Sequence, residues 1–157
     1  MDVTVTQEND PASNRRLLEA LTARLPQWFA QAESNRHYAE QAEKLEAWIA
    51  RLNGQAPGML LLKRHSATSA EIYWLGVDPS HHRRGVGRAL ISALERRLYE
   101  EKARFLFVTT LHPEVAYEPY QRTRSFYESM GFELALSSAQ GPTGPSSDPL
   151  ACYLKLL

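Results

Sequence analysis

The chain has 157 residues, 43% of them hydrophobic and 23% charged, which indicates one globular domain over residues 1–157 and excludes a disordered chain. Its 18 basic side chains (Lys and Arg) equal its 18 acidic ones, so it lacks the overall positive charge that grips a nucleic-acid backbone. No apolar run approaches the roughly 20 residues of a membrane span, and the single cysteine, Cys152, excludes an internal disulfide. We expect a soluble cytoplasmic protein that binds neither nucleic acid nor membrane.

The first half of the chain predicts a strand, two helices and three further strands. Leucines recur at helical spacing after Asp10-Pro11, which starts a helix, and Pro26 ends it. Asn53-Gly54 is a strong signal for a hairpin turn, and β-branched and aromatic residues crowd the strand before Pro79. The expected elements are a strand over residues 1–7, helices over 10–25 and 35–46, and strands over 47–52, 58–64 and 70–77.

The second half continues with alternating helices and strands. Val86, Leu90 and Leu94 fall on one face of a helix whose opposite face is charged, and Gly131 is placed to cap the next helix. The expected elements are helices over 85–101 and 120–130, strands over 104–110, 132–136 and 151–157, and a Gly/Pro/Ser-rich loop over 141–149. This order predicts the α/β class, with a mixed central sheet of about seven strands flanked by about four helices.

The turn between the strand over 70–77 and the helix over 85–101 has the features of a phosphate site. Amides at a helix start have no intrahelical partner, and the helix dipole adds partial positive charge there. Gly85 and Gly87 let a ligand approach the backbone closely. Arginines reinforce the site at positions 83, 84 and 88, with a further one at 96 or 97.

The kind of phosphate ligand is narrowed by what this turn lacks. A nucleotide-triphosphate loop ends in Gly-Lys-Ser/Thr, and no lysine lies between Lys63 and Lys102. A dinucleotide fingerprint needs a third glycine, where this chain has Leu90. Taken alone, the Gly-x-Gly pattern also fits an ordinary strand-to-helix connection with a solvated basic turn.

Two ordered motifs add a specific resemblance. They are Val77-Asp78-Pro79 with His82-Arg83-Arg84-Gly85-Val86-Gly87, and Phe126-Tyr127-Glu128-Ser129-Met130-Gly131-Phe132. With these motifs the sequence resembles the GNAT superfamily of acyl-CoA N-acyltransferases over nearly its whole length. The resemblance implies the GNAT fold, acetyl-CoA (coenzyme A) as co-substrate without a metal, and transfer of the acetyl group to a primary amine by direct attack in a ternary complex.

The resemblance also implies a cofactor site. In the family the coenzyme pyrophosphate sits on the Gly-x-Gly turn, and the pantetheine arm pairs with the end of the preceding strand. The corresponding positions here are Leu75, Gly76, Val77, His82, Arg83, Arg84, Gly85, Val86, Gly87, Arg88 and Tyr120. Two of them depart from the family pattern: His82 replaces Gln or Arg, and Tyr120 stands where Asn is frequent. A neutral imidazole can still donate a hydrogen bond to phosphate, but less well than arginine.

Two residues are candidates for the chemistry. Tyr127 matches the family's tyrosine near the coenzyme thiol, where a phenol can protonate the departing thiolate. Its alternative role is that of a core aromatic residue. Glu71 is the candidate base for the incoming ammonium, because only a neutral amine attacks, and it shares a strand face with Tyr73. The alternatives for Glu71 are a solvated strand residue and a chain of waters that takes the proton instead.

The acceptor is expected between residues 28–38 and the loop over 111–124. That loop carries Glu114, Tyr117, Glu118 and Tyr120, and such acidic and aromatic residues suit a cationic amine: an aminoglycoside, a polyamine or a peptide or protein amine. His81-His82 lacks a third ligand for a metal.

Three further possibilities stay open. The apolar last strand over 151–157 is a candidate edge for a homodimer. The two other readings of the chain are a catalytically silent acyl-CoA sensor of the same fold and a protein that uses the turn to bind another nucleotide.

Overall fold

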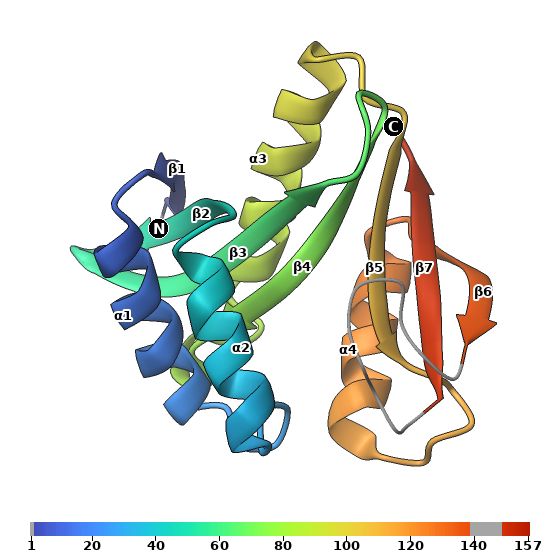
Figure 1. Cartoon of the computed structure of the whole chain (residues 1–157), viewed down its shortest axis with the longest axis horizontal. Coiled ribbons are helices and arrows are strands. Elements are labelled where there is room, and N and C mark those ends of the chain that lie inside the picture. Colours follow the sequence, from blue (N-terminus) through green and yellow to red (C-terminus); the bar gives the residue numbers. More distant parts are fainter. Residues whose placement is uncertain (1, 139–148) are drawn as a thin grey trace.

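The computed structural model describes residues 2–138 and 149–157, in which seven strands form one mixed sheet and four helices flank it (Figure 1). The elements are β1 (Thr4–Glu8), α1 (Pro11–Ala23), α2 (Ala32–Ala42), β2 (Glu46–Leu52), β3 (Gln55–Arg64), β4 (Ser69–Val77), the short 3-10 helix η1 (Pro79–His81), α3 (Val86–Glu100), β5 (Phe105–Leu111), α4 (Glu118–Ser129), β6 (Glu133–Ser138) and β7 (Leu150–Leu156). The predicted α/β class, with its mixed seven-stranded sheet and four helices, is confirmed. Within the described residues no helix is long and apolar enough to cross a membrane.

Most predicted elements agree with these bounds to within a few residues. The largest shift is at α2, which ends at Ala42 where the sequence predicts a helix to residue 46. Glu46 belongs instead to β2, where it pairs in register with Leu62 of β3. The predicted loop over 141–149 lies outside the described residues, except for Pro149.

The position of the last strand corrects a prediction. The strands run in the order β1-β2-β3-β4-β5-β7-β6, so β7 lies inside the sheet and β1 and β6 form its edges. β7 pairs antiparallel with β5 from Leu150 to Leu156 and with β6 on its other side. Residues 151–157 are therefore not a free edge, and the proposed route to a homodimer through them is wrong.

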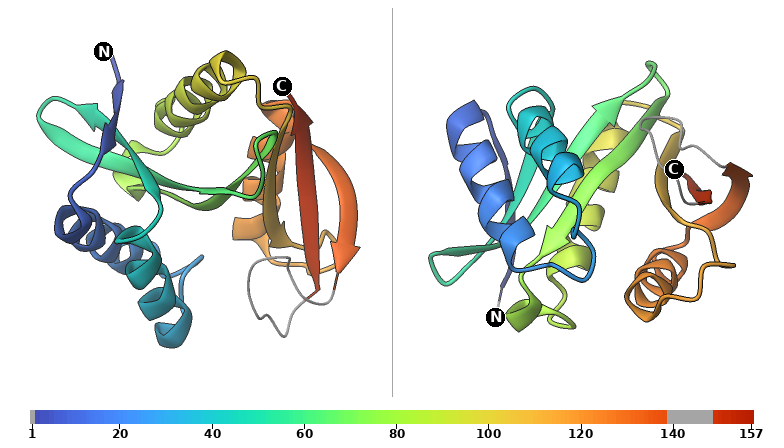
Figure 2. Two further views of the ribbon diagram at one scale, coloured as in Figure 1. Left: turned by 45° about the horizontal axis from the view of Figure 1, so that its top comes forward. Right: turned by 60° about the horizontal axis from the view of Figure 1, so that its bottom comes forward.

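Two apolar clusters hold the helices on opposite faces of the sheet (Figure 2). Leu18 and Leu21 of α1 and Ala39 of α2 pack against one face. Leu90 and Leu94 of α3 pack against the other, in the cluster that also contains Tyr127 of α4. The apolar helix faces predicted from the sequence are the faces that pack against the sheet, because burial of apolar surface is the main driving force for such packing.

A glycine in β3 sets the height of α3 above the sheet. A Cβ at Gly58 would lie 2.7 Å from Cγ1 of Val86 and 3.2 Å from Cδ1 of Leu90. Only a residue without a side chain lets the first turn of α3 sit this close to the strand. The contact fixes the start of α3 beside the end of β4.

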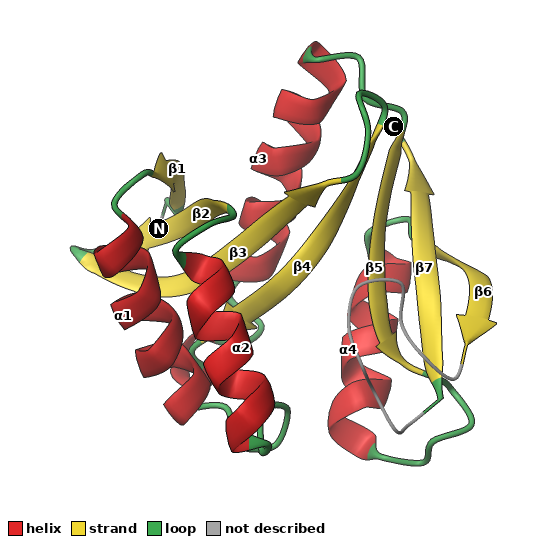
Figure 3. Ribbon diagram, viewed as in Figure 1, coloured by secondary structure: helices red, strands yellow, loops and turns green. Residues whose placement is uncertain are grey.

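The parallel strands β4 and β5 stay together over a short length only. Their register covers Ser69, Ala70 and Glu71 of β4, after which the two strands diverge (Figure 3). A β-bulge lies just beyond this point, because Leu62 of β3 pairs with Ile72 while Leu61 pairs with Trp74, which leaves Tyr73 as the extra residue. The divergence of the two strands frees the β5-facing edge of residues 72–77.

Candidate active site

The turn that joins β4 to α3, residues 78–85, is called here the phosphate turn. Its first residue, Asp78, is 5% exposed and accepts hydrogen bonds from the backbone N–H of Ser80 at 2.9 Å and from its Oγ at 2.7 Å. Arg24 at the end of α1 forms an ion pair with the same carboxylate. Burial alone would raise the pKa of Asp78, but the Ser80 hydrogen bonds and the Arg24 charge together hold it below its ordinary value. The charged carboxylate thus anchors the turn.

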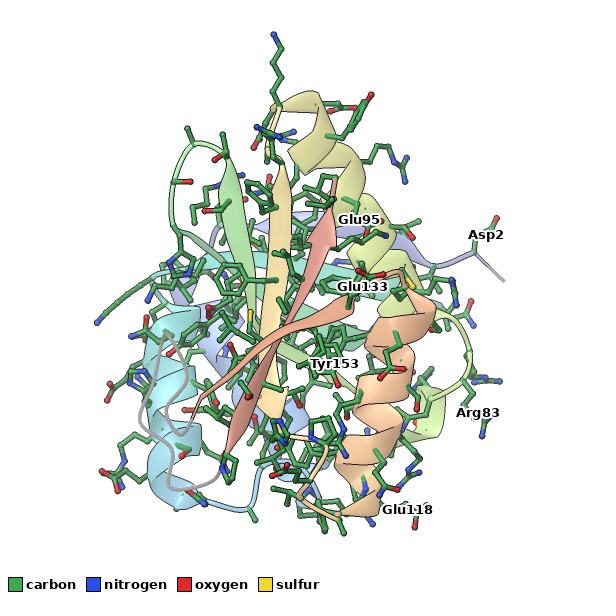
Figure 4. The ribbon with its side chains drawn as sticks, turned by 90° about the vertical axis from the view of Figure 1, so that its right-hand side faces the viewer. Asp2, Arg83, Glu95, Glu118, Glu133 and Tyr153 are labelled. Atoms are coloured by element: carbon green, nitrogen blue, oxygen red, sulfur yellow. The ribbon has the colours of Figure 1, made fainter. Side chains whose placement is uncertain are left out.

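The backbone of the phosphate turn forms a concave set of amides. Arg83 and Gly85 both have positive φ, at 61° and 80°, and flank Arg84. Left-handed backbone is uncommon for a residue such as arginine, and alternating backbone handedness turns successive N–H groups toward one point, where an anion can bind. The first intrahelical bond of α3 runs from Ala89 N–H to Gly85 O, so the amides of residues 86–88 precede it. Arg83 extends outward from this turn (Figure 4).

His82 is held by the strand that precedes it. Its Nε2 lies 2.7 Å from the carbonyl oxygen of Val77, and a carbonyl only accepts, so Nε2 carries the proton. The edge of the Trp28 ring approaches the imidazole, with 5.7 Å between ring centroids. The sequence suggested that His82 donates to phosphate, but the structure commits Nε2 to the backbone.

A cavity of about 950 Å³ opens from the phosphate turn into the wedge between β4 and β5. This volume is typical of a small-molecule site. Eleven residues predicted for catalysis or cofactor binding line it: Leu75, Gly76, Val77, His82, Arg83, Gly85, Val86, Gly87, Arg88, Tyr120 and Tyr127. Among the described residues, the lining includes neither Arg84 nor Glu71.

Tyr127 lies on α4 in an apolar part of this cavity. It is 4% exposed, and its ring packs against those of Phe126 and Phe132. Burial first, and then the neighbouring Tyr120, raise the pKa of Tyr127 well above the ordinary value for a phenol. Tyr127 therefore stays protonated throughout the neutral range and can donate a hydrogen bond or a proton into the cavity.

Glu71 is not among the described residues that line the cavity. Its side chain is almost fully buried, and its Oε2 is 3.3 Å from Nε2 of His65. The carboxylate is close enough to Tyr38 and Tyr73 to raise the pKa of each, in addition to the larger effect of burial. Glu71 therefore does not line the cavity, whereas Tyr38 and Tyr73 do.

Contacts that sequence reasoning missed close the wedge on the side opposite the β4–β5 pairing. The loop between α1 and α2 reaches α4 through three hydrogen-bonded groups, which we call the clasp. Tyr117 donates its hydroxyl to Gln27 O at 2.7 Å, and Tyr120 donates to Trp28 O at 2.8 Å. Trp28 Nε1 in turn donates to Pro119 O and to Thr123 Oγ1, each at 3.1 Å. In the sequence, the one feature that could have indicated these contacts is Trp28, a large aromatic residue in a loop.

The predicted acceptor segments contribute to different degrees. Trp28 and Tyr38 line the cavity from the first segment, and Glu118 and Tyr120 line it from the second. Tyr117 is used in the clasp. Glu114 stays exposed next to His112, so it does not join the site. In the two stretches that the structure describes, no three His, Cys, Asp or Glu side chains gather closely enough to hold a metal ion.

Comparisons with known proteins agree with this architecture. A family model for the acetyltransferase (GNAT) domain matches residues 43–134. No curated protein matches the chain.

Among solved structures, a protein from Desulfovibrio desulfuricans assigned to the GNAT family aligns over 99% of both chains, with a TM-score of 0.80 and 19% identity. The ribosomal-protein-S18-alanine N-acetyltransferase of Escherichia coli aligns over 99% of this chain and 94% of its own, with a TM-score of 0.74 and 20% identity. The PaiA N-acetyltransferase of Thermoplasma acidophilum, in complex with coenzyme A, aligns over 100% of both chains, with a TM-score of 0.73 and 14% identity.

Proposed function

Since the chain belongs to the GNAT acetyltransferase family, whose domain model matches more than half of it, we propose that it transfers the acetyl group of acetyl-CoA to a primary amine. The amine attacks directly in a ternary complex. The observation that carries this proposal is the position of the phosphate turn, which opens into the wedge between β4 and β5. An anion site and an apolar slot with free strand edges are thereby joined in one cavity, as a long phosphorylated thioester requires.

Several features fit acetyl-CoA as the donor. The amides at the start of α3 and the side chains of Arg83 and Arg88 would hold the pyrophosphate. A Cβ at Gly87 would lie 3.1 Å from Cζ of Phe126, so a side chain at this position would crowd the Phe126 ring that also lines the cavity. Oγ1 of Thr110, a 7% exposed residue that lines the cavity, has no hydrogen-bond partner among the described residues. A buried hydroxyl of this kind needs a partner, and the polar groups of a pantetheine arm can supply one.

Tyr127 fits the role of general acid. Bound acetyl-CoA supplies the acetyl group as a thioester, and a thiolate departs when the amine attacks. Tyr127 would donate its phenolic proton to that thiolate, because burial keeps the hydroxyl protonated and places it in the cavity wall. The phenol recovers its proton from solvent after the product leaves.

Glu71 remains the predicted base, although its position makes a direct contact with the amine unfavourable. Because Glu71 is almost completely buried and does not line the cavity, it would act through an intervening group or through a negative charge. A negative charge behind the wall stabilises a positively charged acceptor and any cationic group that forms near it.

The first experiment is calorimetry with acetyl-CoA, and with coenzyme A, ATP and NAD as controls. We expect acetyl-CoA and coenzyme A to bind and ATP and NAD to fail, because the slot beyond the phosphate turn takes a pantetheine arm. Equal binding of ATP would contradict the proposal and favour a general nucleotide site.

The second experiment measures release of free coenzyme A thiol in the presence of single amines. The panel is an alanine-terminated peptide, an aminoglycoside and a polyamine, with ethanolamine and hydroxylamine as the smallest members. Turnover with any of them supports the transferase. Selective binding of acetyl-CoA without turnover on the whole panel would instead favour a silent acyl-CoA sensor.

A further inference from the structure

The wall of the cavity that faces α2 contains a hydrogen bond between two titratable side chains. Tyr73, the bulged residue of β4, lines the cavity, and its hydroxyl lies 2.8 Å from Nε2 of His37 on α2. His37 is exposed to solvent on its other side. This pair therefore connects the interior of the cavity with bulk water through a single hydrogen bond.

We propose that Tyr73 and His37 carry the acceptor's proton from the cavity to solvent. The inference rests on the proposed acetyl transfer and adds the route by which the ammonium becomes a nucleophile. The amine N–H proton moves to the Tyr73 oxygen as the Tyr73 hydroxyl proton moves to Nε2 of His37. The resulting imidazolium releases its proton to water, so the net change is conversion of an ammonium to a neutral amine plus one solvated proton. Tyr73 touches the amine, and His37 acts through Tyr73.

Tyr73 cannot serve as the base without its partner. Burial, followed by the nearby Tyr38 and Glu71, raises the pKa of Tyr73 to about 12, so its phenolate is scarce at neutral pH. A phenol can nevertheless relay a proton when an acceptor is bonded to its own hydrogen. An imidazole is the one ordinary side chain that changes charge near neutrality, which suits it to receive that proton.

Charges around the pair act in both directions. Lys63 of β3 lies 5.6 Å from the centroid of the Tyr73 ring and opposes accumulation of positive charge. Glu71 of β4 interacts electrostatically with Tyr73 and raises its pKa, so a negative charge on Glu71 favours positive charge at the pair. On α2 itself, Glu33 and Glu40 occupy the neighbouring turns on the side of His37, where acidic groups stabilise an imidazolium. Tyr38 contacts the rings of both His37 and Tyr73, and its raised pKa keeps it neutral.

The geometry favours this pair over Glu71 as the first proton acceptor. Glu71 is 1% exposed and lies outside the lining of the cavity among the described residues. Tyr73 borders the cavity and His37 borders solvent, so a proton that follows them leaves the protein. The negative charge of Glu71 assists this route without receiving the proton.

Kinetics with two amine probes test the relay. Ethanolamine is protonated at neutral pH and must lose a proton, whereas hydroxylamine arrives neutral. We expect His37→Gln, which keeps a hydrogen-bond acceptor near Tyr73 but does not titrate, to lower kcat for ethanolamine by about 10²-fold at pH 7. The acid limb of the pH–rate profile of His37→Gln should move to higher pH, because more of the ethanolamine must then arrive already deprotonated. Tyr73→Phe should have the same effect, and in both variants kcat should fall much less for hydroxylamine than for ethanolamine.

Tyr99→Phe is the matched control, since Tyr99 is 73% exposed on α3 and remote from the cavity. An unchanged ethanolamine profile in His37→Gln, with wild-type activity intact, overturns the relay and leaves the transferase standing. A wild-type protein that binds acetyl-CoA but acetylates no amine of the whole panel overturns the proposed transfer and the relay with it.

A second measurement does not depend on turnover. Nitrogen chemical shifts of the His37 ring in labelled protein report which nitrogen carries the proton. The relay requires an unprotonated Nε2 that accepts from Tyr73, with the proton on Nδ1, and Tyr73→Phe should change the Nε2 shift. A proton on Nε2 in the neutral ring of the wild-type protein would overturn the inference.

Discussion

Replacement of Tyr127 by phenylalanine tests the chemistry with little disturbance of the fold. The ring stays in place, since it packs against Phe126 and Phe132 in a cluster that the change leaves apolar. Only the hydroxyl is lost. Because burial raises the pKa of that hydroxyl, wild-type Tyr127 is protonated and competent as an acid across the whole neutral range.

The size of the effect follows from the role of the lost group. Removal of a positioned general acid lowers rates by about 10²–10⁴-fold, which corresponds to about 3–5 kcal/mol of activation free energy. Acetyl-CoA binding should change little, because the phosphate turn and the edge of β4 are untouched. The variant should therefore lose kcat while its donor affinity and its melting temperature stay close to those of the wild type.

Stopped thiol-release assays with saturating donor and the best amine of the panel give kcat, and calorimetry gives the affinity for acetyl-CoA. Phe126→Leu serves as a packing control, since it perturbs the same cluster without removing a hydroxyl. If Tyr127→Phe kept more than about one tenth of wild-type kcat, the loss would be below the range for a general acid and the assigned role would be refuted.

Three further outcomes are expected. Gly87→Glu should abolish acetyl-CoA binding by placing a carboxylate at the anion site, whereas calorimetry of Gly87→Ala separates charge from crowding against Phe126. Trp28→Phe should weaken acetyl-CoA binding, because the clasp loses both hydrogen bonds of the indole N–H. Calorimetry measures this loss of affinity. Asp78→Asn should lower the free energy of unfolding at pH 7. Folding lowers the pKa of Asp78, so its carboxylate stabilises the folded protein at any pH above the ordinary pKa of an aspartate, and this stabilisation is lost as the pH falls through the lowered pKa. Denaturant titrations should therefore show the free energies of unfolding of the two proteins converging below about pH 4.

The sequence predicts the fold well, and most of the residues that it assigns to the donor side line one cavity, because both depend on local patterns. The strand end at Val77, the glycines at 85 and 87 and the apolar stripe of α3 are all neighbours along the chain. Each pattern has a direct structural cause, such as the positive φ that Gly85 adopts to start the helix. Tyr127 could be placed for the same reason, since it lies within a short motif.

The parts that the sequence does not predict depend on contacts between distant segments. The clasp joins residues that lie at least 90 positions apart, and no local sequence pattern predicts it. The inner position of β7 depends on which strand becomes the neighbour of β5, and an apolar strand fits the edge or the interior of a sheet equally well. The pairing of His37 with Tyr73 follows from the bulge in β4, which decides which side chains face α2.

The clasp also has a consequence for the order of events in turnover. It bridges the α1–α2 loop and α4 at one end of the wedge, while β4 and β5 hold the other end together. An extended molecule bound between them must slide out along its length or wait for the clasp to open. If the proposed acetyl transfer takes place, we expect loosening of the clasp to speed the departure of coenzyme A and to shorten the residence time of the donor. The same hydrogen bonds would then balance the time for which acetyl-CoA is held against the rate at which the product is released.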